Sequence, residues 1–257
     1  MKVVILAAGQ GTRLRPYTND KPKCMVELCG KPLLDYQLAA FELAGIKDIT
    51  VVAGYKADYI KRDGLKKIVN ARFASTNMVS TLLCAESIFD GSDDVLITYG
   101  DIIYQGEVLE KILEADGPLA ITVDKEWRRL WSLRMENPLD DAETLKLDGE
   151  RVIELGKKPL SYDEIQGQYM GLIKVQANVA KDFVNVWKSM DKSATYDGKD
   201  FDNMYLTSFL QYLIDSGWFV RAIPVENGWL EIDTVGDLEY FEGMIKSGKM
   251  SDMFELL

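Results

Sequence analysis

Residues 2–14 read KVVILAAGQGTRL, an apolar run followed by a loop that contains two glycines. The run Lys2–Leu6 has no alternation of polar and apolar residues, which is typical of a strand buried on both faces of a sheet. A glycine loop directly after such a strand lies at its carboxyl end, where open α/β sheets bind their ligands. The stretch therefore predicts an α/β fold with a ligand site beside the first strand.

The residues up to about 123 alternate between the two kinds of element. We expect helices at 33–43, 58–69, 78–88 and 105–115, and strands at 48–53, 94–99 and 119–123. Strands that alternate with helices predict a doubly wound sheet whose strands are mostly parallel. The expected fold class is therefore α/β, with a Rossmann-like, doubly wound mixed sheet.

The pattern changes after about Asp124, where the expected elements become shorter and strands follow one another. We expect strands at 144–147, 152–155, 169–175, 218–224 and 229–233, and helices at 177–190, 202–216 and from about 235. The chain has no internal repeat and no low-complexity linker. We therefore expect a single domain over 1–257, divided into a core of 1–123, a smaller annex of 124–228, and a returning strand with a C-terminal helix over 229–257.

The composition excludes several classes of function. The 257 residues include 30 Lys and Arg, 41 Asp and Glu and no histidine, which gives a formal charge of −11. Without histidine there is no Ser-His-Asp triad, no Cys-His pair and no His-ligated zinc. A strongly acidic surface repels phosphate backbones and anionic lipids, so we expect neither nucleic acid nor a membrane as a partner. The chemistry must come from carboxylates, lysine, arginine, backbone donors or a hard cation.

The cysteines indicate a reducing compartment. Cys24, Cys29 and Cys84 are odd in number and lack the Cys-x-x-Cys spacing of a zinc or redox site. Free thiols are typical of cytosolic proteins, and no apolar stretch reaches the roughly 20 residues of a membrane span. We therefore expect a cytoplasmic protein, as a monomer or a homodimer.

The glycine loop fits neither of two common phosphate-binding motifs. A dinucleotide fingerprint needs a third glycine where Leu14 stands, and a P-loop needs the pattern Gly-x4-Gly-Lys-Ser/Thr. Small residues nevertheless let backbone N–H groups approach phosphate oxygens, and Arg13 and Lys23 add two cations to the same loop. A solvated surface loop is the alternative, but long ordered loops in compact domains are usually functional. The pattern favours a triphosphate site.

Residues 6–34, LAAGQGTRLRPYTNDKPKCMVELCGKPLL, resemble the signature of the nucleotidyltransferase superfamily, whose members join an NTP to a small phosphorylated acceptor. The resemblance implies that the backbone of the loop holds the nucleotide. It also implies that Arg13 binds the β- and γ-phosphates and Lys23 the α-phosphate, both as catalytic residues. The nucleotide-binding residues expected on this loop are Leu6, Ala7, Ala8, Gly9, Gly11, Thr12, Arg13 and Lys23. Gly100 and Asp101, at the end of a later strand, are expected to bind the nucleotide as well.

Two carboxylates at expected strand ends are candidates for a metal site. A triphosphate needs a hard cation, usually Mg²⁺. Asp101 follows Gly100 at one strand end, and Asp233 ends the run WLEID, where strand alternation puts Glu231 on the same face. Taken alone, Asp101 could be a turn residue and Asp233 a helix N-cap. The resemblance implies that Asp101 and Asp233 jointly hold Mg²⁺, and it leaves Glu231 as a further ligand or an acceptor contact.

The segment Ala74–Ser80 is a candidate for the base pocket. Its polar residues, Ser75, Thr76, Asn77 and Ser80, can hydrogen-bond a base edge, cap the following helix, or do both. The segment is similar to the Asn-x-x-Ser-Leu stretch of bacterial choline-phosphate cytidylyltransferases. That similarity favours CTP over UTP or dTTP as the nucleotide.

The annex is expected to bind the acceptor. Sugar-type members of the superfamily carry Glu-Lys-Pro where this chain has Lys157-Lys158-Pro159, so Lys158 matches but the glutamate is missing. This departure argues against a sugar acceptor. Tyr169 and Gly171 match the acceptor-facing strand of the superfamily.

A second acceptor candidate is the segment Asp124–Trp131 with Arg134 behind it. Its tryptophans can enclose a quaternary ammonium, or its arginines can clamp a phosphate or carboxylate. The structural alternative is an ordinary amphipathic surface helix. Arg128, Arg129 and Arg134 on so acidic a chain favour an anionic acceptor such as a phosphorylated amino acid.

The function we expect is Mg²⁺-dependent transfer of CMP from CTP to phosphoglutamine or another phospho-amino compound, in capsule or surface polysaccharide modification. This follows the resemblance to bacterial phosphoglutamine and choline-phosphate cytidylyltransferases. The acceptor phosphate is already an anion, so the reaction needs no general base and no histidine. The alternative acceptors are phosphocholine and 2-aminoethylphosphonate, or a sugar 1-phosphate with UTP or dTTP as the nucleotide. The alternative functions are an NAD-dependent oxidoreductase and a nucleotide-sensing protein without activity.

Overall fold

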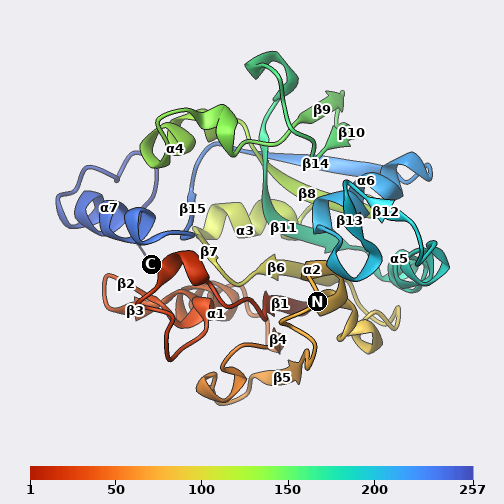
Figure 1. Ribbon diagram of the computed structural model, residues 1–257, viewed down its shortest axis with the longest axis horizontal. Helices are drawn as coiled ribbons and strands as arrows, with labels where there is room; N and C mark the ends of the chain where they lie inside the picture. Colours follow the sequence, from red (N-terminus) through yellow and green to blue (C-terminus); the bar gives the residue numbers. More distant parts are fainter. Residues whose placement is uncertain (257) are drawn as a thin grey trace.

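A sheet of nine strands runs through the computed structural model, which describes residues 1–256 of the chain (Figure 1). In chain order its strands are β1 (Lys2–Ala7), β4 (Asp48–Ala53), β5 (Lys66–Val69), β6 (Val95–Tyr99), β8 (Leu119–Asp124), β9 (Leu145–Asp148), β10 (Arg151–Leu155), β11 (Gln168–Val175) and β14 (Val220–Val225). Their order in the sheet is β5-β4-β1-β6-β11-β8-β14-β10-β9. Three two-stranded ladders lie outside it: β2 (Glu27–Leu28) with β3 (Lys31–Pro32), β7 (Ile102–Tyr104) with β15 (Trp229–Glu231), and β12 (Thr195–Tyr196) with β13 (Lys199–Asp200).

The pairing of these strands confirms the expected mixed sheet. β1 runs parallel to both β4 and β6, and β8 runs parallel to β14. β11 is antiparallel to both of its neighbours, β6 and β8, and so joins the two parallel parts. The strands that follow residue 123 therefore continue the sheet that β1 begins, as Figure 1 shows from β5 at the bottom to β9 at the top.

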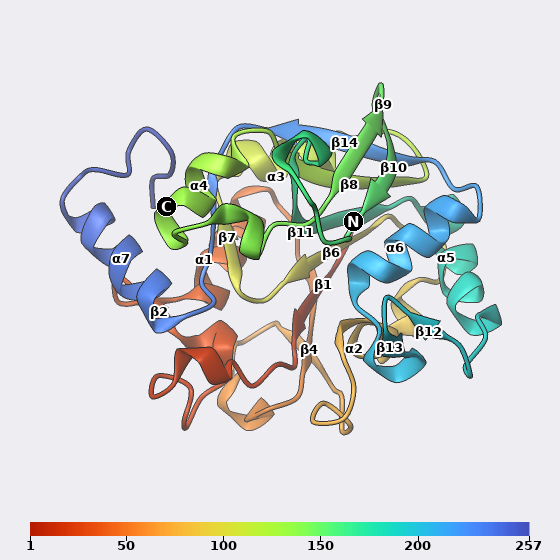
Figure 2. The ribbon, with the colours of Figure 1, turned by 45° about the horizontal axis from the view of Figure 1, so that its top comes forward.

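Helices cover both faces of the sheet. They are α1 (Leu33–Leu43), α2 (Met78–Leu83), α3 (Gly106–Leu113), α4 (Trp127–Arg134), α5 (Ala177–Ser189), α6 (Leu206–Asp215) and α7 (Val235–Lys246). One hydrophobic core takes residues from α1, α3, α4 and α7, and a second takes residues from α2, α5 and α6. Figure 2 shows the two groups on opposite sides of the sheet. None of the helices within 1–256 has both the length and the apolar character needed to cross a membrane.

The prediction of a helix over 58–69 is wrong. A 3₁₀ turn at Ala57–Tyr59 is followed by a loop and then by β5, which pairs parallel with β4. Gly64 lies in the loop with a φ of 76°, a conformation that stops a helix and that glycine adopts without strain. The pairing of residues 66–69 with β4 outweighs the helical periodicity of the segment. The sequence alone does not reveal this pairing.

Two other expected helices are shorter than predicted. The helix expected over 78–88 ends at Leu83, and the one expected over 202–216 begins at Leu206. In the second case the Asp200 carboxylate accepts a hydrogen bond from the N–H of Asn203 and closes a separate 3₁₀ turn. A local side-chain bond thus competes with the extension of the helix.

The second core provides a test of the packing. The ring of Phe183 is fully buried and stacks on Phe89 at 5.5 Å between centroids. We expect Phe183→Ala to lower the free energy of unfolding by about 3–5 kcal/mol through lost contacts and a cavity. Leu160→Ala is the matched control, because that side chain is 90% exposed. Equal urea midpoints for the two variants would contradict this description of the core.

Candidate active site

The loop after β1 folds back so that Lys23 lies beside the end of that strand. Gly11 has a φ of 61°, and a Cβ added to it would lie 3.0 Å from Cβ of Lys23 and 3.2 Å from Cγ2 of Thr18. The hydroxyl of Thr18 donates a hydrogen bond of 2.7 Å to the carbonyl of Gly11. Both the backbone conformation and the close packing therefore require glycine here.

The end of β6 places Asp101 next to this loop. The N–H of Gly100 donates to the carbonyl of Leu6 at 2.9 Å, and a Cβ on Gly100 would lie only 2.8 Å from that carbonyl oxygen. Glycine thus lets the two strand ends lie against each other. Asp101 follows in the turn between β6 and β7, so it is both a turn residue and a residue of the site.

A short ladder brings the C-terminal segment to the same point. β15 pairs antiparallel with β7, with Glu231 opposite Ile102. Beyond the last pair, the N–H of Ile232 donates to the carbonyl of Asp101 at 3.1 Å. The next residue, Asp233, therefore lies beside Asp101 although the two are far apart in the sequence.

The residue that caps α7 is Thr234, so the N-cap alternative for Asp233 is wrong. The N–H of Asp237 donates to the Thr234 hydroxyl, and the Asp237 carboxylate accepts from the N–H of Thr234, which completes a capping box. The Asp237 carboxylate also accepts from the N–H of Asp233 at 3.0 Å. The cap thus fixes the backbone of Asp233 and leaves its carboxylate to the site.

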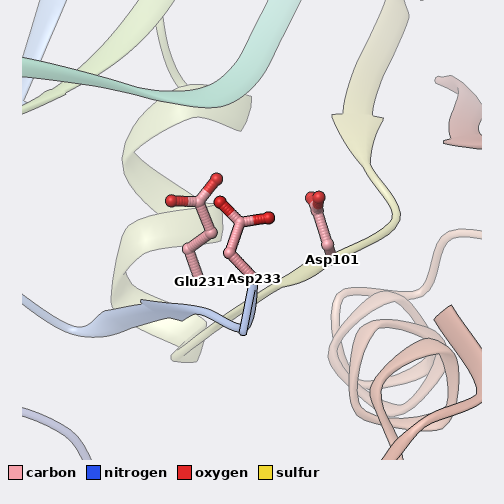
Figure 3. A group of neighbouring side chains, drawn as sticks. All are labelled: Asp101, Glu231 and Asp233. Carbon is pink, nitrogen blue, oxygen red and sulfur yellow. The ribbon is translucent and has the colours of Figure 1, made fainter. Parts of the chain in front are cut away.

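Three carboxylates face one another, as Figure 3 shows: Asp101 from the β6–β7 turn, Glu231 from the end of β15, and Asp233 from the segment after it. One oxygen from each of Asp101, Glu231 and Asp233 lies within 4.8 Å of the others. Oδ1 of Asp101 is buried and has no hydrogen-bond partner among residues 1–256. Clustered carboxylate oxygens with one acceptor to spare are a ligand set that fits a hard divalent cation.

Two of the expected cations contact this cluster. Nζ of Lys23 lies 2.6 Å from Oδ2 of Asp101 and also contacts Asp233, and the guanidinium of Arg13 lies 3.1 Å from Oδ2 of Asp233. Burial disfavours the Lys23 ammonium, but the neighbouring carboxylates outweigh burial and raise its pKa. Lys23 is therefore a fixed positive charge at the end of β1. Arg13 is 62% exposed and reaches over the opening of the site.

A third cation, Arg134, was expected in the acceptor site and lies instead under the carboxylates. Its side chain is 1% exposed, and its nitrogens lie 2.8 Å from Glu231, 3.3 Å from Asp237 and 3.5 Å from Asp233. Burial and the charge of Asp233 still raise the pKa of Glu231 to about 8. One sequence signal indicates this role: Arg134 follows Trp131 by three residues, on the buried face of α4, where an arginine needs buried anions.

A cavity of about 330 Å³ opens over the loop. Most of the expected nucleotide-binding residues line it: Leu6, Ala7, Ala8, Gly9, Gly11, Thr12, Arg13, Lys23, Thr76, Asn77, Gly100 and Asp101, together with Asp233. Cys24, Phe73, Met78 and Thr81 also line it and were not predicted, because nothing in their local sequence marks them.

Two residues expected in the base pocket do not line this cavity. The hydroxyl of Ser75 donates to the carbonyl of Arg72, and that of Ser80 to the carbonyl of Asp202. Asn77 lines the cavity and also caps α2, since its side-chain oxygen accepts from the N–H of Met78 at 2.8 Å. For Asn77 the capping role and the site position are compatible, as expected.

A second cavity of about 220 Å³ adjoins the first, and Met78 and Asp233 line both. Three expected acceptor residues, Tyr169, Gly171 and Glu231, line it. Gly171 has a φ of 85°, and a Cβ there would lie 2.7 Å from the ring of Tyr99. The strand β11 therefore needs glycine at the wall of this cavity.

The structure does not bring Arg128, Arg129 and Lys158 to either cavity, and this corrects the expected acceptor site. The guanidinium of Arg128 lies 3.9 Å from the ring centroid of Tyr162, and Arg129 pairs with Asp252. Nζ of Lys158 donates to two backbone carbonyls, those of Leu139 and Asp140. The physical reason is the amphipathic character of α4, which buries its tryptophans and turns these two arginines outward.

Comparison with known families and proteins gives concordant results. The family described as "MobA-like NTP transferase domain" matches residues 3–161. The CTP:phosphoglutamine cytidylyltransferase of Campylobacter jejuni is 43% identical over 248 residues, which cover 93% of this chain and 98% of that protein. The choline-phosphate cytidylyltransferase of Streptococcus pneumoniae is 43% identical over 81 residues, 30% of this chain and 35% of that one.

Solved structures agree with the fold. The inositol-1-phosphate CTP transferase from T. maritima has a TM-score of 0.70 at 19% identity, and the match covers 96% of each chain. The CTP:phosphocholine cytidylyltransferase from Streptococcus pneumoniae has a TM-score of 0.67 at 22% identity, over 95% of this chain and 98% of that one.

The role of Arg134 can be tested by its effect on stability. We expect Arg134→Met to lower the free energy of unfolding by about 3–5 kcal/mol, because it leaves buried carboxylates without their counter-charge. Arg129→Met on the same helix is the control, and its exposed ion pair should contribute about 1 kcal/mol or less. Urea unfolding followed by circular dichroism measures both. An Arg134→Met variant as stable as the control would show that Arg134 does not neutralise the cluster.

Proposed function

The chain belongs to the MobA-like NTP transferase family, and we propose that this nucleotidyltransferase transfers CMP from CTP to a small phosphorylated amino compound, with release of pyrophosphate. The observation that carries the proposal is the meeting of two cavities at Asp233, beside the Lys23 ammonium. Such a junction suits a reaction between two bound phosphates. The similarity to the Campylobacter jejuni enzyme, which extends over nearly the full length of both chains, supports CTP and phosphoglutamine as the pair.

The carboxylate cluster supports a role for Mg²⁺. We propose that Asp101 and Asp233 hold the ion, with Glu231 beside them. Bound there, Mg²⁺ would neutralise triphosphate charge and polarise the phosphoryl oxygens. Arg134 keeps Glu231 and Asp233 in place from beneath.

The chain's own residues supply positioning and electrostatic stabilisation. The triphosphate lies along the glycine loop, where backbone donors and Arg13 bind it, and Lys23 reaches the α-phosphate. The acceptor enters through the second cavity, and its phosphate oxygen attacks the α-phosphorus in line. Because that oxygen is already an anion, no residue has to remove a proton. Lys23 stabilises the charge that develops on the α-phosphate oxygens.

Phosphocholine and 2-aminoethylphosphonate are the competing acceptors. The similarity to the choline-phosphate enzyme covers only 30% of this chain, whereas the similarity to the phosphoglutamine enzyme covers 93%. Lys157 in place of the glutamate of sugar-type members argues against sugar 1-phosphates. We further propose that the product serves capsule or surface polysaccharide modification.

An assay of pyrophosphate release tests the proposed function. CTP, UTP, dTTP and GTP are each incubated with phosphoglutamine, phosphocholine, 2-aminoethylphosphonate and glucose 1-phosphate. We expect release with CTP and phosphoglutamine, loss of release with EDTA, and recovery with added Mg²⁺. Release with a sugar 1-phosphate and not with any amino compound would overturn the acceptor class, and bound CTP without release would favour a nucleotide sensor.

Lys23 and Asp101 should be essential to that activity. We expect Lys23→Ala and Asp101→Ala each to lower kcat by a factor of about 10²–10³, as the loss of a transition-state charge contact does. Lys21→Ala is the control, since Lys21 lies on the same loop and, among residues 1–256, forms an ion pair with Glu27 alone. All three variants should keep the far-ultraviolet circular dichroism of the wild type. Near-normal turnover of the Lys23 or Asp101 variant would refute the assigned role.

A further inference from the structure

We propose that Glu143 and the aromatic wall of the second cavity bind an ammonium group of the acceptor, so that the enzyme selects phosphorylated amines. This inference rests on the proposed function and deepens it. It also replaces the expectation that arginines select the acceptor through a negative group.

The lining of the second cavity has the chemistry of a cation site. Among residues 1–256 it is lined by five aromatic and four acidic side chains and by no lysine or arginine. Trp131, Trp229 and Tyr205 are among the aromatic residues of the lining, and aromatic rings attract cations that have been removed from water. The guanidinium of Arg134 lies 5.4 Å from the ring centroid of Trp131, so Trp229 and Tyr205 are the rings left to a ligand cation. Lys199 lies 5.4 Å from the ring centroid of Tyr205 but does not line the cavity.

Glu143 is the acid of this lining that has no partner. Glu231 and Asp233 pair with Arg134 and Lys23, and Asp141 accepts a hydrogen bond from Nε1 of Trp131 at 3.2 Å. The Glu143 carboxylate accepts no hydrogen bond and forms no ion pair with any residue that the structure describes. Glu143 is half-buried at the wall of the cavity, and a ligand ammonium there would supply a counter-charge.

The electrostatics of Glu143 agree with this role. Burial raises the pKa of Glu143 to about 7, and the charges of Asp141 and Asp197 add to the effect. The surroundings therefore disfavour a further negative charge and favour a positive one. A ligand phosphate or carboxylate in contact with Glu143 would be repelled.

The backbone of Glu143 is held in place before any ligand binds. Its N–H donates to Oε1 of Gln168 at 3.1 Å, and Nε2 of Gln168 donates back to the carbonyl of Glu143. Gln168 is 3% exposed and begins β11, so this exchange ties Glu143 to the central sheet. The next residue, Tyr169, also lines the cavity, and its ring centroid lies 5.8 Å from that of Tyr99. A recognition residue on a fixed backbone loses little entropy on binding.

The arrangement of the cavity sets the orientation of the acceptor. Asp233 lies at the border with the nucleotide cavity, where Lys23 and Arg13 bring positive charge. The phosphate of the acceptor belongs at that border. The ammonium belongs against Glu143 and the rings, so the acceptor spans the cavity from one charge to the other.

A pair of ligands that differ only in the amine tests the inference. We would use phosphoglutamine and its deaminated analogue, in which hydrogen replaces the α-amino group, with the full-length wild type, Glu143→Gln and Glu136→Gln. Glu136 is exposed, lies just beyond α4 and outside the cavity, and controls for the loss of one negative charge. Titration calorimetry gives the affinities, and pyrophosphate release gives KM and kcat.

We expect the wild type to bind the amine at least about tenfold more tightly than its analogue, which is the effect of one charge-assisted hydrogen bond. Glu143→Gln should remove this preference by raising KM for the amine, with kcat and the KM for CTP little changed. Glu136→Gln should behave as the wild type. If Glu143→Gln does not fold, Glu143→Asp should weaken the amine selectively, because its carboxylate is withdrawn by one methylene.

Three results would overturn the inference: equal affinity of the wild type for both ligands, equal loss of both ligands in Glu143→Gln, or the same change in Glu136→Gln. Different results would refute the ammonium site and the proposed cytidylyl transfer. Turnover of both ligands at equal rates would refute the ammonium site and leave cytidylyl transfer intact. Selective binding of the amine without pyrophosphate release would refute the transfer and leave the ammonium site.

Discussion

The site depends on one partly buried interaction, the contact of the Lys23 ammonium with the carboxylates of Asp101 and Asp233. These residues come from the loop after β1, the turn after β6, and the segment after β15. A separate feature brings each of these three residues into contact. Gly11 lets the loop with Lys23 fold back, Gly100 lets the end of β6 lie against β1, and the β7–β15 ladder places Asp233 beside Asp101. The chain as a whole carries a formal charge of −11, while Arg13 and Lys23 lie at the proposed triphosphate site.

The sequence was sufficient to predict this part of the site because its determinants are local. Continuous apolar runs marked β1 and β6, and the glycines after them marked the strand ends where the loop and Asp101 lie. Asp233 and Glu231 could be placed on one face by strand alternation alone. Their approach to Asp101 depends on the β7–β15 pairing, which was not predicted. The resemblance implied only that Asp101 and Asp233 act together.

The acceptor side could not be predicted in the same way, because it depends on which face of α4 is buried. In the sequence, only its spacing from Trp131 distinguishes Arg134 from Arg128 and Arg129. α4 turns those two arginines outward and buries Arg134 under Glu231. Glu143 has no motif around it and is identified only by the cavity it lines and by the absence of a partner among the described residues. Likewise, β5 replaced an expected helix because of its pairing with β4, which is not a local property.

The central claim is that two bound phosphates react directly, with the protein contributing only position and charge. The stereochemistry at the α-phosphorus tests it most directly. With a single isomer of CTP that carries sulfur on the α-phosphate, the configuration of the product is measured by phosphorus NMR. One in-line displacement predicts inversion. Retention would show two displacements and a covalent nucleotidyl-enzyme, which would contradict the account.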